Sequence, residues 1–443
     1  MIRSSSLLRL GVASIVAAGL LAVAACGGSS QPKLKGERIP VLLFDPTLKP
    51  DPALAAEGVS LTRPYANADW PQVGGAPSHA MEHVALNDVP KRVWSAGIGE
   101  GSDDQRKLLA QPVVADGKIF TLDAVAEARA YRAADGRRLW RAELLPTQES
   151  GGGTMGGGIA YDEGRLYVTT GFSDVVALDA ETGKEIWRRR VSGPSRAAPT
   201  VADGRVFVTT VESRTHALAA DDGRQLWTHD GTSEVSGFLG GASPAVSEGI
   251  VVVAYPSGEI FGIRADSGRQ VWSEFLPLPS RTSQASDLAD IRAAPVIYQG
   301  TVFAISNSGR MAAINLRSGA RQWEQRIGSI QPPWVDGDNV FVVTSDAEIA
   351  CLNRRDGRVR WVRSLPRWEN EKKKRDPIAW TGPVLAGDRL ILAGSQSMAV
   401  AISPYTGDLL GQVEMPDPIS IPPAIADKTA FFVTDDADLV ALR

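Results

Sequence analysis

Asp222-Gly223-Arg224-Gln225-Leu226-Trp227 is one copy of the pattern that decides the fold: a turn dipeptide ending in glycine, with a tryptophan four residues later. The other complete copies are Asp135-Gly136…Trp140, Thr182-Gly183…Trp187, Ser267-Gly268…Trp272, Ser318-Gly319…Trp323 and Asp356-Gly357…Trp361. A seventh turn, Thr406-Gly407, is followed by Gly411 in place of the aromatic residue. The seven glycines lie 47, 40, 45, 51, 38 and 50 residues apart, a spacing typical of the four-stranded blade of a β-propeller.

A second turn leads into an apolar strand in every repeat, and it occurs eight times rather than seven. Its copies are Asp116-Gly117, Glu163-Gly164, Asp203-Gly204, Glu248-Gly249, Gln299-Gly300, Asp336-Gly337, Gly387-Asp388 and Asp427-Lys428. The chain ends in a strand-like segment, Asp438–Arg443, while a tryptophan strand around Trp94 has no repeat before it. Pairing these two strands completes an eighth blade and removes the exposed sheet edges of an open array. The sequence therefore predicts an all-β fold: an eight-bladed propeller of four-stranded antiparallel blades, closed by its N-terminal and C-terminal strands.

The repeated tryptophans are interpreted as structural. Glycine in the turn can take a positive φ, which suits a tight hairpin, and a tryptophan on the next strand offers a large flat surface to the neighbouring blade. We therefore expect blade-docking roles for Trp94, Trp140, Trp187, Trp227, Trp272, Trp323 and Trp361.

The first residues indicate export. A basic start is followed by an apolar run, Leu10–Ala25, which is too short to span a bilayer comfortably and is typical of a secretory signal. The small residues before Cys26 resemble a bacterial lipobox, in which the cysteine is lipidated and becomes the first residue of the mature protein. We expect a signal peptide over 1–25, a lipidated Cys26 with a Pro/Gly-rich tether over 26–66, and the propeller over 67–443. The alternative is an ordinary signal peptide with Cys26 incidental.

Charge and cysteine content exclude several classes of function. Cleavage after Ala25 would remove two arginines and no acid, so the net charge would move from −4 to −6, and nucleic acid is not the expected partner. Once Cys26 carries lipid, Cys351 is the only thiol left, and its alternating strand predicts a buried structural role.

The motifs that match catalytic patterns have low specificity. His79-Ala-Met-Glu82-His83 matches the H-x-x-E-H zinc pattern, but flanking glycine and proline favour a short surface turn over a helix. The basic run Lys372–Arg375 is interpreted as a solvated loop that an acidic partner could use. We expect no catalytic residue, no metal and no cofactor.

Two loops between consecutive blades suggest a partner surface instead. Phe238 and Leu239 stand among glycines in the first loop, and Asp290 and Arg292 lie at the corresponding place one blade later. Adjacent loops of this kind could form one apolar and charged surface. In the alternative, Phe238 and Leu239 fold back onto their own blade.

The turn–glycine–tryptophan repeat resembles the quinoprotein (PQQ-like) propeller superfamily. Together with the lipobox it is similar to the BamB family of outer-membrane lipoproteins, over essentially everything from Lys35 onward. The matching motifs include Gly36-Glu37-Arg38, Asp69-Trp70-Pro71, Gly74-Gly75, Arg196-Ala197-Ala198-Pro199 and Ser243-Pro244.

The resemblance implies a non-enzymatic role in the outer-membrane β-barrel assembly machine. It implies binding to the periplasmic POTRA domains of BamA and to other Bam subunits, contact with unfolded outer membrane proteins, and a lipid anchor in the outer membrane facing the periplasm. The family's contact loops correspond to Phe238, Leu239, Asp290 and Arg292. The family often has Leu-Arg in the first loop and two acids in the second, so the charges here are rearranged.

Two other functions compete with this one. A quinone-dependent dehydrogenase would commonly carry an adjacent cysteine pair, calcium-binding acids and a catalytic aspartate, and this chain has no Cys-Cys pair. The other alternative is a scaffold lipoprotein of another envelope complex.

Overall fold

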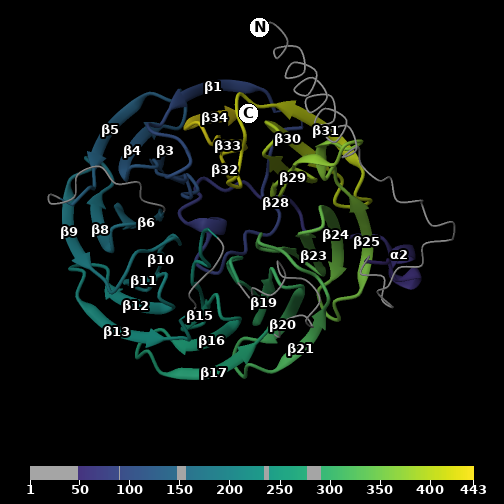
Figure 1. The fold of residues 1–443 in the computed structure, drawn as a ribbon, viewed down its shortest axis with the longest axis horizontal. Helices are drawn as coiled ribbons and strands as arrows, with labels where there is room; N and C mark the ends of the chain where they lie inside the picture. The colour runs from purple at the N-terminus through teal and green to yellow at the C-terminus, as the bar shows by residue number, and fades with distance from the viewer. Residues whose placement is uncertain (1–47, 89, 147–155, 234–238, 277–290) are drawn as a thin grey trace, which may run out of the picture. The chain divides into compact units, whose positions relative to one another are not determined.

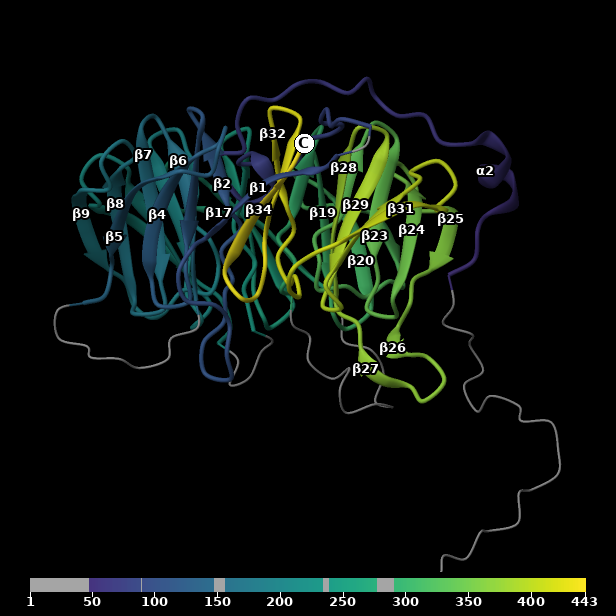
Figure 2. The ribbon, with the colours of Figure 1, turned by 90° about the horizontal axis from the view of Figure 1, so that it is seen from above.

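Eight four-stranded antiparallel sheets stand around a common axis in the computed structural model, which describes residues 48–88, 90–146, 156–233, 239–276 and 291–443 (Figure 1). Figure 2 shows the ring from the side. The predicted eight-bladed, all-β propeller is confirmed.

In the first four blades, the strands are ordered from the innermost to the outermost as they follow one another in the chain. Blade 1 comprises β2 (Val113–Ala115), β3 (Lys118–Leu122), β4 (Glu127–Arg132) and β5 (Arg138–Glu143). Blade 2 comprises β6 (Gly157–Asp162), β7 (Arg165–Thr170), β8 (Asp174–Asp179) and β9 (Glu185–Arg190). Blade 3 comprises β10 (Thr200–Ala202), β11 (Arg205–Thr209), β12 (Arg214–Ala219) and β13 (Gln225–Asp230). Blade 4 comprises β14 (Ala245–Ser247), β15 (Ile250–Ala254), β16 (Glu259–Arg264) and β17 (Gln270–Phe275).

The second half of the ring follows the same order until its last blade. Blade 5 comprises β18 (Val296–Tyr298), β19 (Thr301–Ser306), β20 (Arg310–Asn315) and β21 (Arg321–Gln325). Blade 6 comprises β22 (Trp334–Asp336), β23 (Asn339–Val343), β24 (Glu348–Asn353) and β25 (Val359–Ser364). Blade 7 comprises β28 (Trp380–Ala386), β29 (Arg389–Gly394), β30 (Met398–Ile402) and β31 (Leu409–Glu414). Blade 8 comprises β32 (Ala424–Ala426), β33 (Thr429–Val433) and β34 (Asp438–Leu442), with β1 (Arg92–Gly97) as its outermost strand.

Blade 8 closes the ring as the sequence predicts. β1 pairs antiparallel with β34, and Trp94 lies opposite Ala441. The first strand of the propeller therefore completes the sheet formed by the last three.

Seven of the eight boundaries between blades carry the same tryptophan contact. Each indole N–H donates to a backbone carbonyl of the next blade at 2.7–3.2 Å. Each ring also lies on the turn glycine of that blade, where an added Cβ would come within 2.5–2.8 Å of the indole. These glycines have φ between +70° and +76°, so glycine is required both for the turn and for the approach of the ring. The eighth boundary, after β31, has Gly411 in this position.

A segment before β1 lies along the innermost strands of the blades. Residues 67–86, which we call the strap, bond in turn to the innermost strand, or the residue just after it, in all eight blades. Its contacts, in order around the ring, are Asn67–Asp427, Trp70–Val114, Pro71–Tyr161, Gln72–Val201, Pro77–Val246, Ser78–Ile297, Glu82–Trp334 and Val84–Leu385. The strap therefore closes the ring a second time, independently of the outer β1–β34 seam.

The residues before the strap depart from the predicted tether. Residues 26–47 lie outside the described residues, but helix α2 (Pro52–Glu57) packs beside β25 of blade 6. The Asp51 side chain caps this helix, its backbone N–H donates to Val359 at 2.8 Å, and Leu54 is 2% exposed. Residues 48–66 are therefore held on the propeller, because α2 buries an apolar side chain there. Within the described ranges, no helix has the length and apolarity needed to cross a membrane.

Candidate functional site

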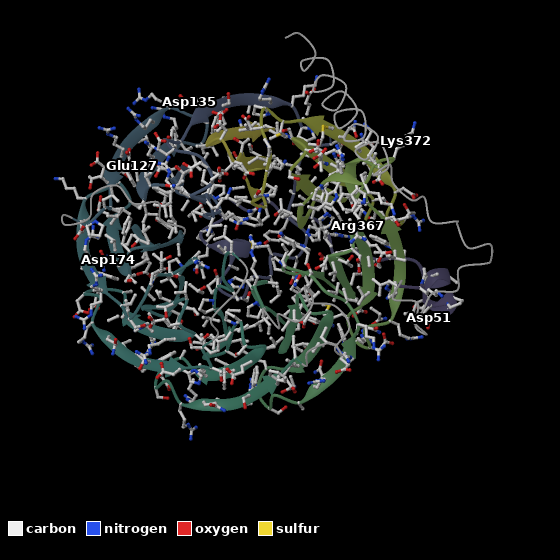
Figure 3. The ribbon with its side chains drawn as sticks, in the orientation of Figure 1. Asp51, Glu127, Asp135, Asp174, Arg367 and Lys372 are labelled. Carbon is white, nitrogen blue, oxygen red and sulfur yellow. The ribbon has the colours of Figure 1, made fainter. Side chains whose placement is uncertain are left out.

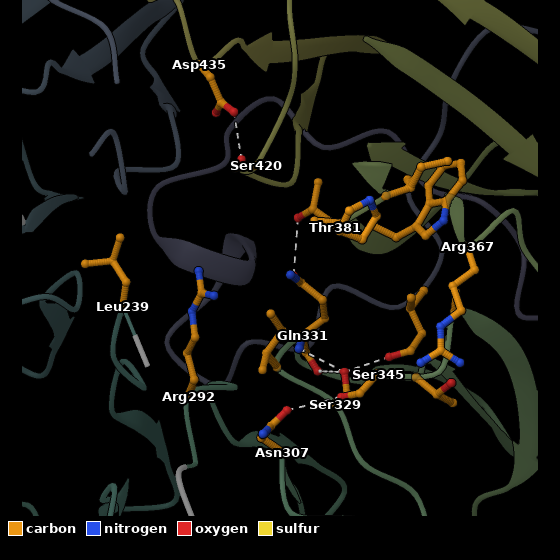
Figure 4. A pocket seen from close by; sticks show the side chains of 18 of the residues that line it. Leu239, Arg292, Asn307, Ser329, Gln331, Ser345, Arg367, Thr381, Ser420 and Asp435 are labelled. Carbon is orange, nitrogen blue, oxygen red and sulfur yellow. Dashed lines mark hydrogen bonds between the residues drawn. The ribbon is translucent and has the colours of Figure 1, made fainter. Parts of the chain in front are cut away.

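A central cavity of the propeller, which we call the funnel, lies at the face opposite the strap (Figure 4). The connections between blades that the structure describes lie on this face (Figure 2). The volume of the funnel is about 530 Å³, and it is lined by residues from the turn between β23 and β24 and from the segments that precede several innermost strands. At the other end of the ring, the strap bonds to the innermost strands.

Hydroxyl and amide groups form a hydrogen-bonded wall on the side of blades 5 to 7. Ser329 donates to the carbonyl of Val343 at 2.6 Å and accepts from the backbone N–H of Gln331 at 2.9 Å. The Gln331 side chain accepts from the Thr381 hydroxyl at 3.2 Å (Figure 4). Because these groups satisfy one another, the wall is fixed before any partner arrives.

Three cations and one acid line the funnel: Lys107, Arg292, Arg367 and Asp435. Burial raises the pKa of Asp435, and Ser420 donates to its carboxylate at 2.8 Å. Arg367 is half exposed and lies 3.5 Å from Asp346. The lining is thus more basic than the protein as a whole, which favours acidic groups on whatever enters.

Apolar groups complete the lining. Trp380 is buried and donates its indole N–H to the carbonyl of Pro366 at 2.9 Å, and Leu239, Leu109 and Ile378 lie around the same cavity. Among its described lining residues there is no histidine or cysteine. The described part of the chain also contains no group of three histidine, cysteine, aspartate or glutamate side chains able to hold a metal ion. This lining suits binding of a mixed apolar and acidic surface.

The two predicted partner loops meet at the funnel. Leu239 and Arg292 both line it, and a Cβ added to Gly240 would lie 2.5 Å from the Arg292 guanidinium (Figure 4). Phe238 and Asp290 lie outside the described residues. The structure therefore brings one residue of each loop to a single surface.

The basic run forms a hairpin on the same face. Between β25 and β28 the chain makes β26 (Trp368–Asn370) and β27 (Arg375–Pro377), and residues 369–377 are exposed. The Glu371 carboxylate accepts from the backbone N–H of Arg367 at 2.9 Å, which holds the base of the hairpin. In Figure 3, Arg367 lies nearer the propeller axis than Lys372 does.

The H-x-x-E-H residues belong to the strap, and the expected surface turn is wrong. His79 and Glu82 have φ of 60° and 51°, so they are not on a helix. His79 is buried and bonds through Nδ1 to the carbonyl of Pro295 at 2.8 Å, and burial lowers its pKa to about 4. His83 is buried and accepts from the backbone N–H of Asp388 at 2.9 Å. Both histidines fasten the strap to the blades.

Gln331 and Ser420 were not predicted from the sequence, although a signal for them exists. A proline directly precedes the innermost strand in six blades, and before four of these prolines a residue two or three positions earlier lines the funnel. These residues include Leu109, Arg292, Gln331 and Ser420.

Comparisons with known proteins agree on one family. A family model described as "Outer membrane protein assembly factor BamB" matches residues 124–363, more than half of the chain. The outer membrane protein assembly factor BamB of Salmonella typhimurium is 27% identical over 311 residues, covering 70% of this chain and 78% of the relative. That of Shewanella oneidensis is 25% identical over 368 residues, covering 82% and 90%.

Solved structures share the fold at low identity. BamB from Moraxella catarrhalis matches with a TM-score of 0.67 and 17% identity, covering 80% of this chain and all of that one. Quinohemoprotein alcohol dehydrogenase from Comamonas testosteroni matches with a TM-score of 0.65 and 13% identity, covering 88% and 84%. At these identities the likeness concerns the propeller alone, which carries both an assembly factor and an enzyme.

Proposed function

The chain belongs to the BamB family of outer membrane protein assembly factors, and from this premise we propose that it is a non-enzymatic scaffold of the outer-membrane β-barrel assembly machine. In this role it binds the periplasmic POTRA domains of BamA, cooperates with other Bam subunits and aids the insertion of outer membrane proteins. It is held in the outer membrane, facing the periplasm, through lipid on Cys26. Contact with unfolded barrel proteins belongs to the same proposal.

The funnel face is the proposed docking surface for BamA. The observation that carries this choice is the meeting of the two loops, because Leu239 and Arg292 line one cavity that opens to solvent. Arginine is enriched at protein interfaces, Leu239 adds apolar area beside it, and the hydrogen-bonded wall next to them is already ordered. Lys107 and Arg367 add positive charge that would steer an acidic partner.

The donor set of the funnel does not fit a quinone and its calcium ion. Calcium takes six to eight oxygen ligands, most of them carboxylates or carbonyls. Among the residues that the structure describes, Asp435 supplies the only carboxylate of the funnel lining, and burial raises the pKa of that carboxylate. The funnel's residues therefore favour a scaffold over a quinone-dependent dehydrogenase.

Binding of the purified full chain to isolated POTRA domains tests the proposal. We expect Leu239→Ala and Arg292→Ala each to weaken binding at least tenfold, the range of an interface hot spot. Arg317→Ala is the matched control, because Arg317 is 79% exposed on a turn at the other end of blade 5. Unchanged binding in both funnel variants would reject the docking surface.

A second measurement separates the alternatives. Addition of pyrroloquinoline quinone and calcium to the full chain should give no dye reduction, and appearance of such activity would reject the scaffold role. Normal levels of barrel proteins in a deletion strain would instead assign the chain to another envelope complex.

A further inference from the structure

A polar pocket of about 490 Å³ lies on the strap side of the propeller, between residues 57–62 and blade 6. Its lining includes Gly337 and Asp338, in the turn between β22 and β23, and Asn339, the first residue of β23. Arg354 and Arg355, in the turn between β24 and β25, also line it. The funnel is lined by the turn between β23 and β24, at the other end of the same blade. The two cavities therefore open on opposite faces.

We propose that this pocket, which we call the arginine pocket, binds a phosphate-class anion through Arg354, Arg355 and Arg360. The proposal does not depend on the role of the funnel, because no residue lines both cavities.

Arg360 is a buried cation in the lining of the pocket. It is 8% exposed, and its Nη1 donates to the carbonyl of Gly58 at 2.9 Å. Its Nε is buried and has no hydrogen-bond partner among the described residues. The nearest acid, Glu57, lies 3.6 Å from Nη1 and is 62% exposed, so water screens the pair. A buried guanidinium whose only nearby acid is exposed lacks a firm countercharge, and an anion in the pocket that Arg360 lines would supply it.

Acids are also scarce around Arg354 and Arg355. Arg354 and Arg355 share one carboxylate, that of Asp338, at 3.4 and 3.0 Å. Asp336, the other acid nearby, already accepts from the backbone N–H of Thr62 at 3.0 Å and from its hydroxyl. Three guanidiniums thus line the pocket against two acids, Asp338 and the exposed Glu57.

The number of guanidinium groups in the pocket indicates which class of anion it binds. A guanidinium presents paired N–H donors that match two oxygens of a carboxylate or a phosphate. A carboxylate has only two oxygens, whereas a phosphate offers enough acceptors for several arginines at once. The ligand could be a soluble phosphate monoester or the phosphodiester of a lipid headgroup, which share this chemistry.

Calorimetric titration of the full chain, held in detergent in a buffer that contains no phosphate, tests the proposal. The two probes are inorganic phosphate and glycerophosphoglycerol, a water-soluble phosphodiester headgroup. We expect saturable binding of at least one probe. Tighter binding of the diester would assign the pocket to a lipid and turn the strap face toward the membrane. Tighter binding of inorganic phosphate would assign it to a soluble ligand.

Matched arginine variants tie binding to the pocket. Arg355→Gln should weaken the preferred probe about tenfold, because one charge-assisted contact is lost. Arg317→Gln is the control: Arg317 is 79% exposed against 72% for Arg355, and it pairs with Glu248 as Arg355 pairs with Asp338. Arg360→Met should abolish binding; if it does not fold, Arg354→Gln replaces it. Absence of saturable binding of both probes, or binding unchanged in Arg355→Gln and Arg354→Gln, would overturn the proposal.

Discussion

Replacement of Gln72 by methionine should test whether the strap closes the ring energetically. The Gln72 side chain is 3% exposed and imitates a strand: its Nε2 donates to the carbonyl of Val201 and its Oε1 accepts from the N–H of Val201, both at 2.8 Å. Methionine keeps the length of the side chain and removes both bonds. Val201 is 1% exposed, so its N–H and carbonyl would lose their partners away from water. At roughly 1–3 kcal/mol for each buried unsatisfied group, we expect a loss of roughly 2–6 kcal/mol.

Urea unfolding, followed by tryptophan fluorescence and by far-UV circular dichroism, measures this loss. Gln412→Met makes the same chemical change at an exposed position of β31, and we expect it to alter the free energy of unfolding by less than about 0.5 kcal/mol. If Gln72→Met behaves like Gln412→Met, the strap does not hold blade 3, and the second closure of the ring is wrong.

Three further predictions concern the turns, the strap histidine and the buried thiol. Gly319→Ala places a Cβ 2.5 Å from Trp272, whereas the Cβ of Gly300→Ala, at nearly the same φ, meets nothing within 4 Å. In thermal unfolding, Gly319→Ala should be destabilised by at least about 1 kcal/mol more than Gly300→Ala. Equal losses of stability in the two variants would contradict the tryptophan contact. Burial lowers the pKa of His79 to about 4, whereas in the unfolded chain it is 6.5, so between these pH values the unfolded chain binds more protons than the folded one. The free energy of unfolding should therefore fall by about 3 kcal/mol as pH drops from 6.5 to 4. His79→Phe should flatten this pH dependence. Burial also raises the pKa of the Cys351 thiol, so a thiol reagent should label it only after unfolding, and rapid labelling of the native protein would contradict its buried position.

The blades could be predicted because their determinants are local and repeated. A turn glycine and a tryptophan four residues later both act within a few residues, and the same contact recurs at seven boundaries. The closure by β1 and β34 could be predicted from the number of turns, because the turn before the tryptophan strand occurs seven times and the other turn occurs eight times.

The strap and the funnel could not be predicted in the same way. The strap has no periodic pattern, and its bonds join residues far apart in the chain, such as Asn67 and Ile425. Its histidines are fixed by backbone groups of Pro295 and Asp388, which local sequence does not reveal. In the funnel, Leu239 and Arg292 were found from loop position, but Trp380 and Gln331 come from other blades and meet them only when the ring has closed.

Site-specific photocrosslinking in cells tests the central claim most directly. A photoreactive amino acid is placed at Leu239, which lines the funnel, and at Arg317, which is exposed at the other end of blade 5. Docking through the funnel face predicts a crosslink to BamA from position 239 and only background from position 317. Only background crosslinking from position 239 would contradict it, whether or not position 317 crosslinks to BamA.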